Sequence, residues 1–216
     1  MARLPQPQFT PADARALTPR EARMVTVLMV GRILGPLGDG LCRIRNLSAG
    51  GLMAEVFAPF AVEDRIGIEL RNGFMLDGEV RWTRQGQIGI RFDQPVADIK
   101  SFLAEQRAGL RRRDGYVGRA PRLLVDCSAD IRIDGRHHHG VVADISQYGA
   151  RLVTAAPLVR DGQLSLSVAG LPHLRGAVRW VAEDGAGITF LDPLGFKPLG
   201  EWLRDPALRY NRRQGA

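Results

Sequence analysis

The chain carries an internal repeat, and this repeat restricts the possible folds more than any other feature of the sequence. Three separate segments recur 98 positions further along the chain, each with at least one glycine kept in place. The matched segments are 46–51 with 144–149, 78–82 with 176–180, and 89–92 with 187–190. Upstream of them, an Arg-x-x-Arg pattern recurs at a spacing of 99, which predicts one residue gained or lost in the first hairpin. We therefore interpret the chain as one domain written twice.

Each copy spans roughly 85–95 residues, which is enough for a small autonomous domain. Within each copy, short β-branched and alternating segments are separated by turn signals about every 8–12 residues, a pattern typical of a small barrel or sandwich. Asp134 and Gly135 form a strong signal for a tight turn between the first two strands of the second copy. Apolar residues at helical spacing follow each copy, so we expect a helix to close each domain.

The segments outside the copies predict tails and a linker. Residues 1–17 are rich in Pro and Ala and indicate a disordered tail, while residues 205–216 are predicted to be a basic tail. We expect the first domain over residues 18–97 and a helical and basic linker over 98–117. The second domain, with its C-terminal helix, is expected over 118–204.

Cellular location and charge can also be predicted. No apolar run approaches the roughly 18–20 residues of a membrane span, and the N-terminus lacks the apolar core of a signal peptide. Cys42 and Cys127 lie singly in strand-like segments, which indicates buried thiols in a reducing cytoplasm. The formal charge is +7, and because Lys100 and Lys197 are the only lysines, arginine supplies nearly all the positive charge. The planar guanidinium of arginine suits phosphate groups and flat rings.

Two polar elements recur in both copies and form a candidate ligand site. An Arg-x-x-Arg pattern precedes the first strand, and an Asx-x-Ser-x-x-Gly turn follows 22 or 23 residues later. The candidate residues are Arg20, Arg23, Asn46, Ser48 and Gly51 in the first copy, and Arg119, Arg122, Asp144, Ser146 and Gly149 in the second. A hairpin of this length returns to its start, so we expect the arginines to face the turn. Cations opposite acceptors, with a glycine that permits positive φ and close ligand approach, favour a phosphorylated, flat and polar ligand.

These motifs occur in both copies together with Gly-x-Val-Arg-Trp and Gly-Ile-x-Phe strands, and nearly the whole chain apart from the tails and linker resembles the PilZ family. The resemblance implies a mainly β fold of two tandem six-stranded barrels, each closed by a C-terminal helix. It also implies an effector or adaptor that binds the bacterial second messenger cyclic di-GMP and acts on a protein partner. In the family, the arginines bind phosphates and stack on guanine, while the Asp or Asn and the Ser recognise guanine edges.

The arginine motif departs from the family pattern Arg-x-x-x-Arg, because Pro19 and Gly118 occupy the positions of the leading arginine. Arg15 or the linker arginines at 111–113 are candidates to replace it. A charge-assisted hydrogen bond to phosphate contributes about 1.5–3 kcal/mol, so losing one lowers affinity about 10–100-fold. The second copy keeps an acidic residue in its turn and follows the linker arginines, which makes it the better candidate. The alternative is a degenerate interaction module that does not bind nucleotide.

Other classes of function have less support. The absence of a nucleophile motif, a P-loop and a dinucleotide-binding fingerprint argues against an enzyme. The histidines at 137–139 would alternate between the faces of a strand, so we expect a solvated hairpin tip and no metal or other cofactor. We expect Trp82 and Trp180 to be core residues, and Arg81 and Arg179 beside them to face outward. Neither copy has the aromatic platform of single-strand binders, which argues against a nucleic-acid partner.

Overall fold

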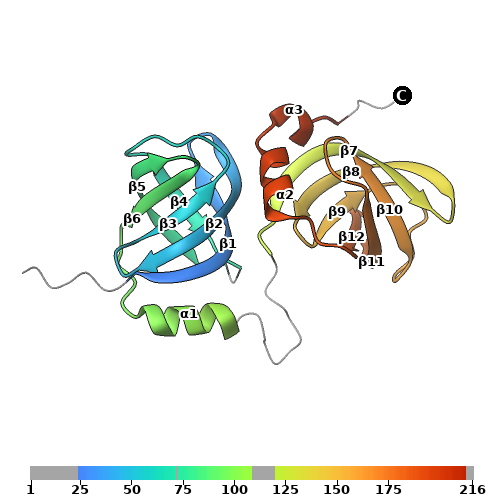
Figure 1. Ribbon diagram of the computed structural model, residues 1–216. Coiled ribbons are helices and arrows are strands. Elements are labelled where there is room, and N and C mark those ends of the chain that lie inside the picture. The colour runs from blue at the N-terminus through green and yellow to red at the C-terminus, as the bar shows by residue number, and fades with distance from the viewer. Residues whose placement is uncertain (1–23, 72, 109–119, 213–216) are drawn as a thin grey trace, which may run out of the picture.

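The computed structural model describes residues 24–71, 73–108 and 120–212. These residues form two closed six-stranded antiparallel barrels, each followed by a short helix (Figure 1). The prediction of a mainly β fold with two tandem barrels is therefore confirmed. The exact domain boundaries given above stay predictions.

The two barrels have the same topology. The strands of the first are β1 (Val25–Gly35), β2 (Gly38–Ser48), β3 (Gly51–Val56), β4 (Arg65–Glu69), β5 (Met75–Arg84) and β6 (Gln87–Phe92). The strands of the second are β7 (Leu123–Ile133), β8 (Arg136–Ser146), β9 (Gly149–Val153), β10 (Gln163–Val168), β11 (Leu174–Ala182) and β12 (Gly185–Phe190). The first sheet runs in the order β1-β2-β3-β6-β5-β4 and closes by pairing β1 with β4. The second closes in the same way by pairing β7 with β10.

A helix follows each barrel and completes its core. α1 (Ile99–Ala108) adds Phe102 and Leu103 to the buried cluster of the first barrel, and α2 (Phe196–Leu203) adds Leu199 and Trp202 to that of the second. A further short helix, α3 (Pro206–Arg209), lies within the segment predicted to be a basic tail. None of the helices in the described residues is long and apolar enough to cross a membrane.

Two local predictions from the sequence are confirmed. Asp134 and Gly135 have positive φ angles of 47° and 80° and form the tight turn between β7 and β8. Cys42 and Cys127 are free and buried, and burial raises the pKa of both thiols to about 12. The histidines at 137–139 follow Arg136, the first residue of β8, and therefore lie next to this turn.

The register of the first hairpin in each barrel shows where the spacing of the repeat changes. β1 begins opposite Leu47 and β7 begins opposite Ile145, so both hairpins correspond throughout at a spacing of 98. The prediction of a residue gained or lost inside the first hairpin is wrong, because the spacing changes before β1 and β7. In the first copy, the residue that corresponds to Arg122 is therefore Met24.

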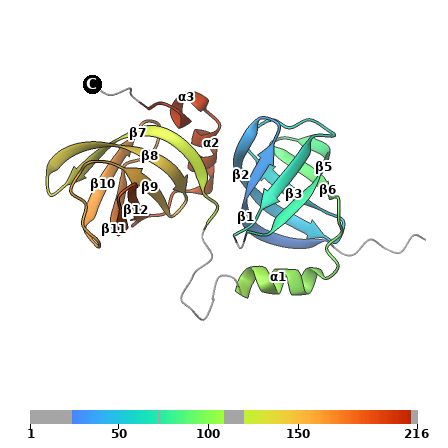
Figure 2. The ribbon, with the colours of Figure 1, turned by 180° about the vertical axis from the view of Figure 1, so that it is seen from behind.

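The barrels share an apolar contact at α2, which lies between them in both views (Figure 1 and Figure 2). The ring of Phe196, at the start of α2, lies 4.9 Å from that of Phe57 in the first barrel, centroid to centroid. The guanidinium of Arg43, also in the first barrel, stacks over the ring of Phe196 at 3.9 Å from its centroid. Gly200 packs so closely on Phe57 that a Cβ there would overlap the ring. Leu41 of β2 belongs to the same buried cluster as the core of the second barrel.

Arg209 of α3 joins the barrels by hydrogen bonds. Its Nη1 donates to the carbonyl of Asp39 at 2.8 Å, and its Nη2 donates to the carboxylate of Asp39. Its Nε and Nη2 also donate to the carbonyl of Leu124 at 2.9 and 2.7 Å. The side chains of Arg209 and Asp39 are only 7% and 12% exposed. Since Arg32 also donates to Asp39 at 2.7 Å, a largely buried charge network spans the interface.

Acid is expected to weaken this network. Burial by itself would raise the pKa of Asp39, but hydrogen bonds and charges from Arg209 and Arg32 outweigh it and hold the pKa below its ordinary value. A carboxyl with a lowered folded-state pKa stabilises the fold above its unfolded pKa, and this contribution is lost as pH falls through the folded value. The difference in melting temperature between wild type and Asp39→Asn should therefore shrink below about pH 4. A constant difference from about pH 6 to pH 2.5 would contradict this expectation.

Candidate functional site

Each barrel has a surface pocket beside its Asx-x-Ser-x-x-Gly turn, and the two pockets correspond at the spacing of the repeat. The second-barrel pocket has a volume of about 490 Å³ and the first-barrel pocket about 710 Å³. The second-barrel pocket is lined by Arg122, Ser146, Tyr148, Gly149, Arg179 and Trp180 among others. The equivalent lining of the first-barrel pocket is Met24, Ser48, Gly50, Gly51, Arg81 and Trp82. Both volumes are in the usual range for small-molecule sites.

The two turns contain the same internal hydrogen bond. Ser146 Oγ donates to the carbonyl of Gly149 at 3.1 Å, and Ser48 Oγ donates to the carbonyl of Gly51 at 3.1 Å. In the second barrel, the backbone N–H of Tyr148 also donates to Ser146 Oγ at 3.3 Å. Ser146 is only 4% exposed. Its hydroxyl therefore holds the turn that presents Tyr148 to the pocket.

The glycine at the end of each turn is required by a close contact between strands. A Cβ on Gly149 would overlap the carbonyl oxygen of Ile188, and a Cβ on Gly51 would overlap that of Ile90. Neither glycine has a positive φ, so these positions do not use the left-handed backbone that glycine permits. The glycines instead allow β9 to start directly against β12, and β3 against β6.

β-Bulges turn the polar and aromatic side chains of the site out of the barrel. The β8–β9 pairing shifts register between Val142 and Asp144, and the β11–β12 pairing shifts between Val178 and Trp180. Both valines are 1% exposed. Regular alternation would direct Asp144 and Trp180 inward like the valines two residues earlier. The extra residue of each bulge reverses this direction, and the first barrel has both bulges at equivalent positions.

The prediction that Trp82 and Trp180 are core residues is wrong. Trp82 is 41% exposed, and Trp180 is half-buried in the lining of the second-barrel pocket. Each indole lies over a glycine of the neighbouring strand, Gly89 or Gly187, at which a Cβ would overlap the ring. This contact explains why a tryptophan and a glycine recur together in both copies. Each indole therefore forms a wall of its pocket.

The structure brings the second arginine of the second copy onto the turn. Arg122 Nη1 donates to Asp144 Oδ1 at 2.6 Å, and the two side chains are 32% and 15% exposed. Because a guanidinium has five N–H donors, this single bond leaves further donors for a ligand. The other predicted arginines, Arg20, Arg23 and Arg119, lie outside the described residues.

The first-barrel pocket is less suited to an anion. Met24 occupies the position that Arg122 has in the second barrel. Glu79 of β5 pairs with both arginines of the pocket, Arg81 at 2.6 Å and Arg91 at 3.5 Å. The hydrogen bond from Arg81 holds the pKa of Glu79 below its ordinary value, so this carboxylate is ionised and offsets the positive charge. The second barrel has alanine at the equivalent position.

Two residues of the second-barrel pocket were missed by the sequence prediction. Tyr148 is 45% exposed and occupies a variable position of the turn motif, and because its counterpart is Gly50, the repeat does not mark it. Arg71 comes from the first barrel, so no spacing within one copy connects it with the pocket. Arg179 was predicted to face outward, and it is exposed and lines the pocket.

A family profile described as the PilZ domain matches residues 15–105 and 117–197, which together are most of the chain. The chain therefore belongs to the PilZ domain family and is a tandem PilZ protein. The family consists of non-catalytic cyclic di-GMP receptors. No curated protein matches the chain in sequence.

Several solved structures have a weak overall similarity to the chain. PlzA of Borreliella burgdorferi, in complex with c-di-GMP, is 14% identical with a TM-score of 0.37, and the match covers 83% of this chain and 93% of that one. The inhibitor of motility MotI/DgrA of Bacillus subtilis is 9% identical with a TM-score of 0.31, and the match covers 82% of this chain and 95% of that protein. YcgR of Escherichia coli, in complex with c-di-GMP, is 12% identical with a TM-score of 0.28, and the match covers 75% of this chain and 74% of that protein. The family membership follows from the domain match alone.

Proposed function

We propose that the chain is a cyclic di-GMP effector that binds the nucleotide at the second barrel and passes the second-messenger level to a protein partner. The observation that carries the proposal is the second-barrel pocket, where Arg122 and Arg179 lie beside Trp180 and the Asp144 turn. Membership of a family of cyclic di-GMP receptors supports the same ligand here. We place this activity in the cytoplasm, where PilZ proteins typically act.

The side chains of the pocket suit different parts of this ligand. The guanidinium groups of Arg122 and Arg179 can donate charge-assisted hydrogen bonds to phosphate oxygens, and their planar faces can stack on guanine. The carboxylate of Asp144 accepts hydrogen bonds, which suits the N–H edge of guanine. The indole of Trp180 offers a surface for a base, and such stacking contributes about 1–3 kcal/mol per base.

The first barrel contributes no comparable site of its own in this proposal. It has Met24 where the second barrel has Arg122, and Glu79 pairs with its two pocket arginines. We therefore expect one nucleotide site per chain.

An interaction module that does not respond to nucleotide is the second candidate function. The observation in its favour is Gly118, which stands where the family has its leading arginine.

Calorimetric titration with cyclic di-GMP tests the proposal. Wild type should release or absorb heat, and Arg122→Ala should raise the Kd about 10–100-fold because a charge-assisted contact is lost. Met24→Ala is the matched control, since it changes the equivalent position of the first barrel and should leave the Kd unchanged. No heat from wild type at high micromolar nucleotide would reject the proposal and favour the interaction module.

A further inference from the structure

One arginine of the first barrel lines the pocket of the second. Arg71 directly follows Leu70 in the loop between β4 and β5, and it shares the lining of the second-barrel pocket with Arg122, Arg179 and Trp180. We infer that Arg71 is a ligand-binding residue that the first barrel donates to the anion site of the second. This inference rests on the proposed function and adds to it a site built from both barrels.

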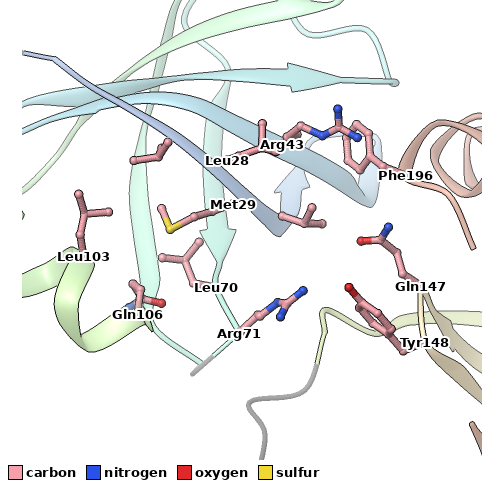
Figure 3. A pocket seen from close by; sticks show the side chains of 12 residues that line it. Leu28, Met29, Arg43, Leu70, Arg71, Leu103, Gln106, Gln147, Tyr148 and Phe196 are labelled. Atoms are coloured by element: carbon pink, nitrogen blue, oxygen red, sulfur yellow. The ribbon is translucent and has the colours of Figure 1, made fainter. Parts of the chain in front are cut away.

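The position of Arg71 is defined by its contact with the turn of the second barrel. Its guanidinium carbon lies 5.7 Å from the centroid of the Tyr148 ring, and the two side chains face each other across the gap between the barrels (Figure 3). Tyr148 is held by the hydrogen bond from its N–H to Ser146 Oγ. Arg71 therefore lies beside the turn that contains both Tyr148 and Asp144.

The electrostatic surroundings leave Arg71 available for an anion. Among the described residues, no carboxylate lies within ion-pair distance of Arg71, whereas Arg122 already pairs with Asp144. Arg179 has a carboxylate at 3.9 Å, that of the exposed Asp161. A cation with no carboxylate partner gains more from a phosphate than one that is already neutralised.

Arg71 also compensates for the change in the arginine motif. Gly118 stands at the position of the leading arginine, so the local segment of the second copy supplies one cation fewer than the family pattern. Arg71 brings one cation to the same pocket from another part of the chain. Arg71 therefore supplies the pocket with a guanidinium in place of the one that an arginine at position 118 would provide.

The two barrels meet at this residue. A cavity of about 540 Å³ lies between them, with Met29, Leu70 and Phe196 in its apolar lining (Figure 3). Arg71 and Tyr148 line both this cavity and the second-barrel pocket, so the two spaces adjoin there. A nucleotide held by the second barrel and by Arg71 contacts both barrels at once. Ligand occupancy then couples the first barrel to the second.

Titration of three variants with cyclic di-GMP tests the inference. Arg71→Ala should raise the Kd about 10-fold or more. The Kd of Arg71→Lys should lie between those of wild type and Arg71→Ala, because lysine keeps the charge but lacks the planar guanidinium. Arg84→Ala is the matched control, since it removes one exposed arginine of the same barrel that does not line the pocket. Its Kd should equal that of wild type. Circular dichroism of each variant checks that it is folded.

Hydrogen exchange provides a second readout that a purely structural role of Arg71 would not reproduce. Cyclic di-GMP should slow amide exchange in the peptide that covers the β4–β5 loop in wild type, and not in Arg71→Ala. If wild type binds, Arg122→Ala binds weakly and Arg71→Ala binds like wild type, the inference is overturned while the proposed function stands. If wild type does not bind at all, the proposed function itself fails.

Discussion

Replacement of Arg209 by alanine is expected to lower the free energy of unfolding by about 3 kcal/mol, the typical cost of removing one partner from a buried ion pair. The Arg209 side chain is 7% exposed and gives hydrogen bonds to Asp39 and Leu124 from the two barrels. The variant leaves the carbonyl of Leu124 without these donors. It leaves Asp39 with Arg32 as its remaining charged partner. Urea denaturation followed by circular dichroism measures the loss.

Arg212→Ala is the matched control for this variant. Arg212 lies just beyond α3, three residues after Arg209, but it is 61% exposed and its guanidinium is 3.8 Å from the carboxylate of Asp126. Exposed pairs of this kind contribute at most about 1 kcal/mol. In an Asp39→Ala background, Arg209→Ala should also cost much less than in wild type. If Arg209→Ala and Arg212→Ala lowered the free energy of unfolding equally, Arg209 would not stabilise the contact between the barrels.

Phe196→Ala is expected to destabilise the protein by about 3–5 kcal/mol, as other buried aromatic truncations do. Phe196 is 5% exposed and contacts Phe57 and Arg43 of the first barrel from its place on α2. Its loss opens a cavity that the two barrels share. Denaturation should show the loss of stability, and small-angle X-ray scattering should show a larger radius of gyration under native conditions.

Phe74→Ala provides a comparison with the same change of side chain. Phe74 also packs against another aromatic ring, that of Phe102 at 5.2 Å between centroids, but it is 43% exposed. It contacts α1 of its own barrel, so its loss should cost less and leave the radius of gyration unchanged. An equal or greater destabilisation by Phe74→Ala would contradict the importance assigned to Phe196.

The fold could be predicted from the sequence because its signals are local and occur twice. Turn residues such as Asp134 and Gly135 fix a hairpin within a few positions, and the Trp82–Gly89 contact needs a glycine wherever the tryptophan lies over the strand. The spacing of Arg122 and Asp144 along one hairpin was enough to predict their proximity. Features of this kind depend only on nearby residues.

The features that could not be predicted depend on strand register or on contacts between barrels. A bulge adds one residue to a strand and reverses the direction of Trp180, which simple alternation assigns to the core. Arg71 and Tyr148 are unmarked by the repeat, because their counterparts at the spacing of 98 are Ala169 and Gly50. Arg209 follows both copies and has no counterpart in a motif. Only the packing of one barrel on the other gives these residues a role.

The position of Arg209 in the chain has a consequence for biosynthesis. Domains generally fold as units as they leave the ribosome, the N-terminal one first. Each barrel closes with its own strands, but the hydrogen bonds to Asp39 and Leu124 need a residue that is translated after both barrels. The hydrogen-bonded part of the contact between the barrels is thus completed last in synthesis, and nascent chains halted before α3 carry two closed barrels joined by the apolar contact at α2 without the hydrogen bonds of Arg209.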